Sequence, residues 1–422
     1  MITIIHTSDW HIGQTFFSHN RDKEHIDFLN WLIQVIADNK ADVLLIAGDV
    51  FDVSNPSSSA QKMFYKFIQK VTLRVPNLQI IVTAGNHDSP SRIETPLPLL
   101  DDKNVVIKGI VPKVDGQIQL DKLITPLYNK EKEVEAFCLT VPYLRQGDYP
   151  RVDAPNPYAS GIHQLYEDLF SYVNRIKTDK QGVVAMGHLQ AIGSDIAEKD
   201  HSEKMIIGGL EAVSPSVFSD FNYTALGHIH KAQRLAKQEH IRYAGSPLPM
   251  SFAEKNYKHG VVKVTLDRGI TTQIEKLEYQ PLVNLISIPS KGSASPSEVM
   301  DLLSDLPNKE DGLNNDLSLY PFLEVRVLLT EPEPLLTKQI ADIIDSKRVR
   351  LARVVNDFQR VSEESESVII NQGLDELTPL DIADRYYKSI YNEGMPEELK
   401  RMFEEVCIDL NREGGSVNHE DN

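Results

Sequence analysis

The sequence predicts an α/β protein whose core is a layered α/β sandwich, followed by a small α+β domain and a C-terminal helical tail. Two observations predict the core. Five short apolar runs, spread over roughly the first 230 residues, each end in a polar cluster, and helical stretches alternate with the runs. A short apolar run bounded by glycine is typical of a buried strand. Helices that alternate with such strands cover a sheet in layers.

The five expected strands are residues 2–5, 43–47, 80–84, 183–186 and, more weakly, 223–226. In open α/β sheets the carboxyl ends of the strands meet at one edge, where binding sites form. We therefore expect the polar side chains that follow the strands to gather at one rim. The clusters are Asp9-Trp10-His11, Gly48-Asp49-Val50-Phe51-Asp52, Gly85-Asn86-His87-Asp88, Gly187-His188 and Gly227-His228-Ile229-His230.

Residues 20–39 and 58–71 have the apolar spacing of amphipathic helices. Residues 256–279 instead give two alternating runs around Asp267-Arg268-Gly269, which indicates a β-hairpin. We expect this hairpin to close a first domain that spans residues 1–279.

A second domain is expected over residues 280–360, with its elements in the order β-α-β-α-β. Ser295 is placed to cap the first of its helices. The domain contains no cluster of the metal-binding type. Its expected strands are 282–288, 321–329 and 349–357, and its expected helices are 295–306 and 334–344.

Residues 361–422 form the third part, a linker followed by two expected helices at 378–392 and 396–411. Two short helices on a tether bury an apolar stripe poorly against each other. They either dock on another protein or pack back on the main body, and we favour docking. The stripe of the second helix consists of Leu399, Met402, Phe403, Val406 and Leu410.

The net charge of −17 argues against a stand-alone DNA-binding protein, because a surface that holds a phosphate polymer is normally basic. The acidic surplus lies in residues 298–316 and 362–422, so tight DNA binding would need a partner. The two cysteines, Cys138 and Cys407, are far apart and form no disulfide framework. We find no signal peptide and no apolar run of about 18 residues, so we expect a cytoplasmic location.

The polar clusters contain the residue types that bind divalent transition metals. On an extended strand end, residues two apart point the same way, so Asp9 can act with His11 and His228 with His230. A dinuclear site needs one shared ligand, and Asp49 is the natural bridge. Two ions about 3.5–4 Å apart activate water and clamp the oxygens of a phosphoester. Five unrelated turns are the alternative, which five clusters in the same context make improbable.

The five motifs, with none missing, resemble those of the calcineurin-like metallophosphoesterases. Residues 85–92 and 243–252, together with the order of the domains, are similar to the SbcD-type subunits of the bacterial SbcCD complex, relatives of the Mre-type recombination nucleases. The resemblance covers nearly the whole chain. It implies a metal-dependent DNA nuclease of recombination and repair, with 3′–5′ exonuclease activity on double strands and endonuclease activity on single strands and hairpins.

The resemblance also implies the ligands of two divalent metal ions. One ion is expected on Asp9, His11, Asp49 and His230, and the other on Asn86, His188, His228 and the same Asp49. Ligands of these types suit Mn²⁺ well, and they do not exclude Fe²⁺, Zn²⁺ or Mg²⁺ as the native metal.

His87 directly follows a ligand, so its ring should point elsewhere in the pocket. It is the best candidate to protonate the leaving oxygen or to stabilise charge on the phosphorane, with a buried turn histidine as the alternative. We expect Asp88 to orient His87, and Asp52 to orient His87 or a ligand, unless both are simple turn caps. By resemblance, residues 245–246 help to place the DNA backbone and Arg92 contacts phosphate.

The resemblance further implies that the second domain caps the nuclease domain and that the tail grips an SbcC-type ATPase. A homodimer within a larger complex is implied in the same way. A plain stabilising or dimer-forming lobe remains the alternative for the second domain. The chain has no Gly-x-x-x-x-Gly-Lys-Ser/Thr loop, so any ATP dependence comes from the partner. Two other functions stay open: a small-molecule phosphodiesterase or protein phosphatase on the same core, and a non-catalytic scaffold.

Overall fold

The computed structural model describes residues 1–100, 104–195, 212–309 and 316–358, with a few further positions between 380 and 403. The chain divides into two compact units, Met1–Phe358 and Gln359–Asn422. Most of the second unit lies outside the described residues, and so do most residues of the two expected tail helices. Among the described helices, none has the length and apolar character needed to cross a membrane.

The first of two six-stranded sheets has the order β16-β15-β1-β4-β5-β6. Strands β1, β4, β5 and β6 are parallel. Strand β15 pairs antiparallel with β1, and its hairpin partner β16 pairs antiparallel with β15 at the edge of the sheet. The bounds are β1 (Ile2–Thr7), β4 (Val43–Ala47), β5 (Gln79–Thr83), β6 (Val105–Lys108), β15 (Gly260–Asp267) and β16 (Ile270–Glu278).

The second sheet has the order β13-β14-β12-β11-β10-β9. Its four central strands are parallel, with an antiparallel strand at each edge. The five strands expected from the sequence are thus divided, with β1, β4 and β5 in the first sheet and β11 and β12 in the second. The bounds are β9 (Ile124–Tyr128), β10 (Val134–Thr140), β11 (Gly182–His188), β12 (Tyr223–Gly227), β13 (Gln233–Leu235) and β14 (Gln238–Tyr243).

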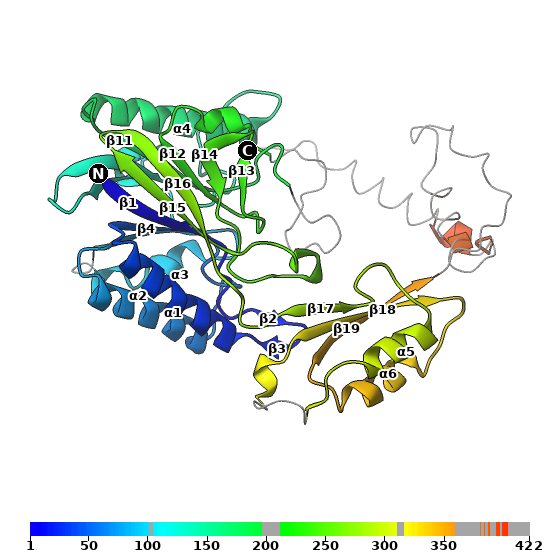
Figure 1. Ribbon diagram of the computed structural model, residues 1–422. Helices are drawn as coiled ribbons and strands as arrows, with labels where there is room; N and C mark the ends of the chain where they lie inside the picture. Colours follow the sequence, from blue (N-terminus) through cyan, green and yellow to red (C-terminus); the bar gives the residue numbers. More distant parts are fainter. Residues whose placement is uncertain are drawn as a thin grey trace. The chain divides into compact units, whose positions relative to one another are not determined.

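The two sheets pack face to face with helices on their outer sides (Figure 1). In β1, Ile4 packs into the layer between the sheets, whereas the adjacent Ile5 packs against the helices. Strands buried on both faces have continuous apolar runs, which explains why these strands could be predicted. The predicted α/β sandwich is confirmed. Its helices are α1 (Asp22–Asp38) and α2 (Ser58–Arg74) on the first sheet and α4 (Pro157–Ile176) on the second.

Residues 285–358 form a smaller lobe with the predicted β-α-β-α-β order and a parallel three-stranded sheet, β17-β18-β19. The side chain of Ser295 accepts a hydrogen bond from the backbone N–H of Glu298 and caps α5, as the sequence predicted. The bounds are β17 (Leu285–Ile288), α5 (Pro296–Ser304), β18 (Phe322–Leu329), α6 (Leu336–Ile344) and β19 (Arg350–Phe358).

A short hairpin, β2 (Thr15–Phe16) and β3 (His19–Asn20), follows the first polar cluster and was not predicted. The ring of Phe16 lies 5.5 Å from that of Phe252 and 4.8 Å from that of Phe322, between ring centroids. These three rings and Val283 form one apolar cluster, which joins the hairpin to the three-stranded sheet.

The remaining described elements are short. They are α3 (Pro90–Glu94), β7 (Lys113–Val114) and β8 (Gln117–Ile118), with the 3-10 turns η1 (Leu97–Leu99), η3 (Leu120–Leu123), η4 (Pro215–Phe218), η5 (Phe252–Glu254) and η7 (Leu317–Leu319).

Candidate metal centre

The polar clusters meet where the carboxyl ends of the two sheets come together. His188, at the end of β11, places its Nδ1 2.9 Å from the backbone oxygen of Ala47 at the end of β4. The backbone N–H of His228, after β12, donates to Asp9 Oδ1 at 2.9 Å. Both contacts join one sheet to the other, so each sheet supplies part of a single site.

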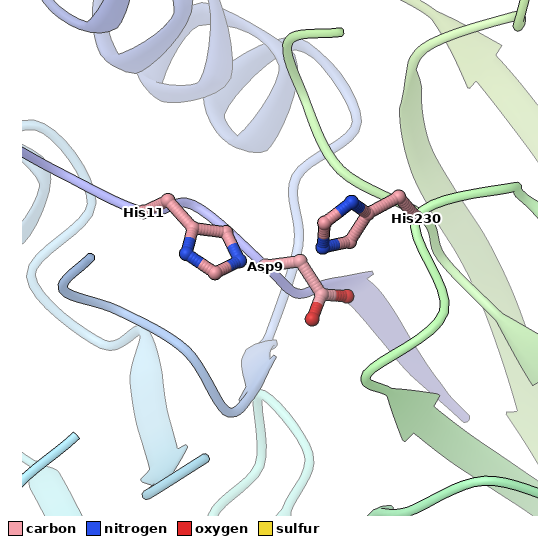
Figure 2. Close-up of side chains that lie close together, drawn as sticks. All are labelled: Asp9, His11 and His230. Atoms are coloured by element: carbon pink, nitrogen blue, oxygen red, sulfur yellow. The ribbon is translucent and has the colours of Figure 1, made fainter. Parts of the chain in front are cut away.

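Asp9, His11 and His230 form the first group of potential ligands. One ligand atom from each lies within 4.8 Å of the others. Figure 2 shows the side chains of Asp9, His11 and His230 close together, with His230 on a different part of the chain. All three side chains are buried.

His11 provides the test of whether these residues fit a metal. Both of its ring nitrogens are buried without a hydrogen-bond partner. The nearest carboxylates, those of Asp49 and Asp52, are 3.7 and 3.4 Å from Nε2 and Nδ1. Buried polar atoms are nearly always paired, so an imidazole in this state has the environment of a metal ligand. The donor set of imidazole and carboxylate agrees with that.

Asp49, His188 and His228 form the second group, and Asn86 lies beside two of its members. Asn86 Oδ1 lies 3.0 Å from both His188 Nε2 and His228 Nδ1. Because the carbonyl of Ala47 can only accept, His188 Nδ1 carries the hydrogen, and its Nε2 is left to face the site.

Asp49 lies between the two groups. Its Oδ1 accepts a hydrogen bond from the backbone N–H of His87 at 2.9 Å. Its Oδ2 is 3.1 Å from His188 Nε2 and 3.7 Å from His11 Nε2. The geometry therefore brings together all seven residues expected as ligands and places Asp49 beside a histidine of each group.

The electrostatics of the site couple Asp49 to the histidines around it. Burial alone would raise the pKa of Asp49, but His188 and His11 hold that pKa well below its usual range. Burial alone would lower the pKa of His188, but the Asp49 carboxylate raises that pKa to about 9. Burial and the nearby His188 lower the pKa of His228 to about 3.

Four of the expected ligands have a left-handed backbone conformation, with φ of 53° at Asp9, 46° at His11, 50° at Asp49 and 98° at His228. Such a conformation costs on the order of 1–3 kcal/mol per residue and persists only where the surrounding structure enforces it. Backbone hydrogen bonds enforce it here, because the N–H of Asp9 donates to Gly48 and that of His11 donates to Asp49.

The motif glycines allow two backbones to approach the ligands closely. A Cβ atom on Gly85 would lie 2.0 Å from Asp49 Oδ1, and one on Gly227 would lie 1.9 Å from the backbone oxygen of Ala47. Both distances are far inside van der Waals contact, so no larger residue fits at either position without displacing a ligand segment.

The expectation that Asp88 orients His87 is wrong. The two carboxylate oxygens of Asp88 accept hydrogen bonds from the backbone N–H groups of Val50, Phe51 and Gly85, at 2.9–3.1 Å. Asp88 thereby ties the segment after β4 to the segment after β5. Burial and the charge of Asp49 raise the pKa of Asp88 to about 6.

His87 is held by the main chain of Asp52, with 2.7 Å between its Nδ1 and the Asp52 backbone oxygen. The Asp52 carboxylate instead faces His11. The rings of His87 and His11 meet edge to face, with 4.8 Å between centroids. Since the carbonyl can only accept, Nδ1 of His87 carries a hydrogen, and the Nε2 atom takes no part in this contact.

Sequence reasoning missed three residues around the site. The ring of Tyr143 lies 6.2 Å from that of His188, and Arg145 Nη2 lies 3.4 Å from the Asp88 backbone oxygen. Both follow the apolar run 134–141, a signal that was overlooked because no Asp or His ends it. The third residue is Glu254, which lies behind His230.

The remaining expected substrate contacts are placed as follows. Arg92 is exposed, and its Nη1 donates to Asn55 Oδ1 at 2.6 Å. Ser246 is buried and donates through its hydroxyl to Leu248 and through its backbone N–H to His230. Ser246 thus supports the His230 segment from within the protein.

The fold and the ring of Asp, His and Asn ligands define a metal-dependent phosphodiesterase. The family model for the calcineurin-like phosphoesterases matches residues 2–232, and the model described as the type 5 capsule protein repressor C-terminal domain matches residues 281–391.

Three curated proteins, each named as the SbcD subunit of the nuclease SbcCD, are similar to this chain. The Rhodobacter capsulatus protein is 32% identical over 360 residues, which cover 83% of this chain and 86% of the relative. The Escherichia coli K12 protein is 28% identical over 96% of both chains. The Bacillus subtilis protein is 30% identical over 63% of this chain and 66% of the relative. The chain belongs to the calcineurin-like phosphoesterases and, within them, to the SbcD family of nuclease subunits.

Proposed function

We propose that the chain is a metal-dependent DNA nuclease that works with an SbcC-type ATPase in DNA recombination and repair. The proposed activities are 3′–5′ exonuclease on double strands and endonuclease on single strands and hairpins. The observation that carries the proposal is the meeting of seven ligand-type side chains, Asp49 among them, in a chain similar over most of its length to named nuclease subunits.

Two divalent ions, with Mn²⁺ as the proposed metal, are assigned to the two ligand groups. The first group is Asp9, His11 and His230, the second is Asn86, His188 and His228, and Asp49 serves both. When bound, such a pair of ions supplies Lewis-acid activation of water and of the phosphodiester.

His87 is the proposed acid of the reaction. Its ring is held by the Asp52 carbonyl beside the ligand His11. In the imidazolium form, Nδ1–H donates to that carbonyl, and Nε2–H is the proton that would pass to the leaving oxygen or stabilise charge on the phosphorane. Asp88 is proposed to act indirectly, because it fixes the backbone that carries Asp49.

A hairpin-ended duplex tests the proposed substrate. We expect Mn²⁺-dependent opening of the hairpin and shortening of the duplex from its 3′ ends, both lost with a chelator. The same preparations are tested on a chromogenic phosphodiester and on a phosphopeptide, with and without the ATPase subunit. Hydrolysis of a small substrate with no DNA cleavage in either setting would replace the proposal with a small-molecule phosphodiesterase or protein phosphatase.

Deletion of residues 375–422 is expected to abolish binding to the ATPase while the metal content stays unchanged. The proposed reason is that the tail carries the apolar stripe for docking, of which Leu399 and Met402 are exposed. The measurement is copurification of the two proteins together with elemental analysis.

Two point variants sharpen this test. Phe403→Asp interrupts the stripe and should weaken copurification, whereas Glu404→Ala, its neighbour outside the stripe, should not. A truncated chain that still copurifies with the ATPase would move the docking surface to the main body.

A further inference from the structure

A buried carboxylate lies directly behind one of the proposed metal ligands. Glu254 ends the turn η5 and is fully buried. Its Oε1 atom lies 3.1 Å from Nδ1 of His230. Glu254 follows no apolar strand and belongs to none of the five sequence motifs, and it comes 24 residues after the histidine that it contacts.

We propose that Glu254 is a positioning residue, which fixes the ring of His230 so that Nε2 is the atom presented to the metal. The proposal rests on the metal centre proposed above. A neutral imidazole carries one ring hydrogen, and a carboxylate acceptor at Nδ1 places the hydrogen there. The lone pair then resides on Nε2, and the carboxylate makes that lone pair more basic.

The structure holds the Glu254 carboxylate rigidly in this place. Its Oε2 atom accepts a hydrogen bond from the backbone N–H of Met250 at 2.9 Å. The two residues are four apart in the chain, so this bond anchors the side chain to its own loop. The position of Oε1 is therefore set independently of His230, which is what an orienting group requires.

His188 shows the same arrangement in the other ligand group. There a backbone carbonyl, that of Ala47, occupies Nδ1 and leaves Nε2 for the site. Each ligand group thus contains one histidine with a fixed ring hydrogen, held by a neutral acceptor in one group and by a carboxylate in the other. The carboxylate adds negative charge beside the Asp9 group, which favours cation binding there.

The test compares Mn²⁺ binding to the whole chain in the wild type, Glu254→Ala and Glu254→Gln, by titration with direct counting of bound Mn²⁺. Loss of an outer partner of a metal-bound histidine typically costs about 10–100-fold in affinity. We expect that loss for one of the two ions in Glu254→Ala and a smaller loss in Glu254→Gln, which keeps an oxygen acceptor. Saturating Mn²⁺ should restore cleavage to within several-fold of wild type.

Lys255→Ala is the matched control. Lys255 follows Glu254 in sequence, and its Nζ donates to Ser287 Oγ at 2.8 Å. Its loss disturbs the same loop, and both ions should still bind with wild-type affinity. Urea unfolding without metal shows whether each variant is folded. If Glu254→Ala does not fold, the metal affinity of Glu254→Gln tests the proposal.

Two results would overturn the proposal: unchanged affinity for both ions in folded Glu254 variants, or an equal loss of affinity in Lys255→Ala. If the proposed metal centre were wrong, the result would differ, because the wild type would then bind fewer than two Mn²⁺ ions. If instead DNA were not the substrate, the wild type would bind two ions but would not cleave DNA.

Discussion

Replacement of Asp49 by alanine is expected to reduce DNA cleavage to background and to lower the metal content. Asp49 Oδ2 lies between His188 and His11, at 3.1 and 3.7 Å, and is the proposed ligand shared by both ions. The variant removes the carboxylate charge that offsets two cations and leaves buried imidazoles facing one another. The measurements are elemental analysis and cleavage of a hairpin-ended duplex on the same preparation.

Two further variants control this prediction. Asp49→Asn keeps an oxygen that can accept from the backbone N–H of His87 but lacks the charge, and it should also be inactive. Asp38→Ala removes an exposed carboxylate from the end of α1, outside the metal centre, and should behave as wild type. Near-normal cleavage by Asp49→Ala would show that the shared-ligand assignment is wrong.

His87→Ala and His87→Gln are expected to retain both ions and to lose about two to four orders of magnitude in rate, the range for loss of a positioned acid or base. His87 is not among the seven expected ligands, and its Nδ1 is occupied by a backbone carbonyl. The structure also brings ligand atoms of His87, His11 and Asp52 within 4.8 Å of one another, so the metal count of the variants tests whether His87 is a ligand. DNA binding should change little, because His87 is one contact among many. Single-turnover cleavage and metal stoichiometry are measured together.

His163→Ala is a suitable control for this pair, because His163 is an exposed histidine on α4. It should leave both rate and metal content unchanged. If the His87 variants lost an ion, His87 would be reassigned as a ligand. An unchanged rate would remove His87 from the mechanism.

Burial decided which parts of the fold could be predicted from the sequence. Strands β4, β11 and β12 are buried along their whole length, so their apolar runs are continuous and end at glycine-rich clusters. The division of the strands between two sheets could not be predicted, because strand pairing depends on contacts between residues far apart in the chain. The hairpin β2–β3 has two residues per strand, too few for a periodic pattern.

The candidate site was predictable to the extent that its residues sit in local motifs. The structure gathers the expected ligands because each follows a strand end. The role of Asp88 was mistaken because its partners are backbone N–H groups of Val50 and Phe51, which no sequence pattern reveals. Glu254 was missed for a similar reason, since only the folding of its loop brings it to His230. The metal assignments themselves remain predictions.

The turn that ends in Glu254 begins with Phe252, in the aromatic cluster that joins the hairpin to the three-stranded sheet. A 3-10 turn rises about 2 Å per residue, so this segment is a stiff link only a few ångströms long. At one end, Phe252 packs against Phe16, which in turn packs against Phe322 of the smaller lobe. At the other end, Glu254 contacts His230. The packing of the smaller lobe and the placement of His230 therefore share one three-residue segment, although the two lie in different parts of the fold.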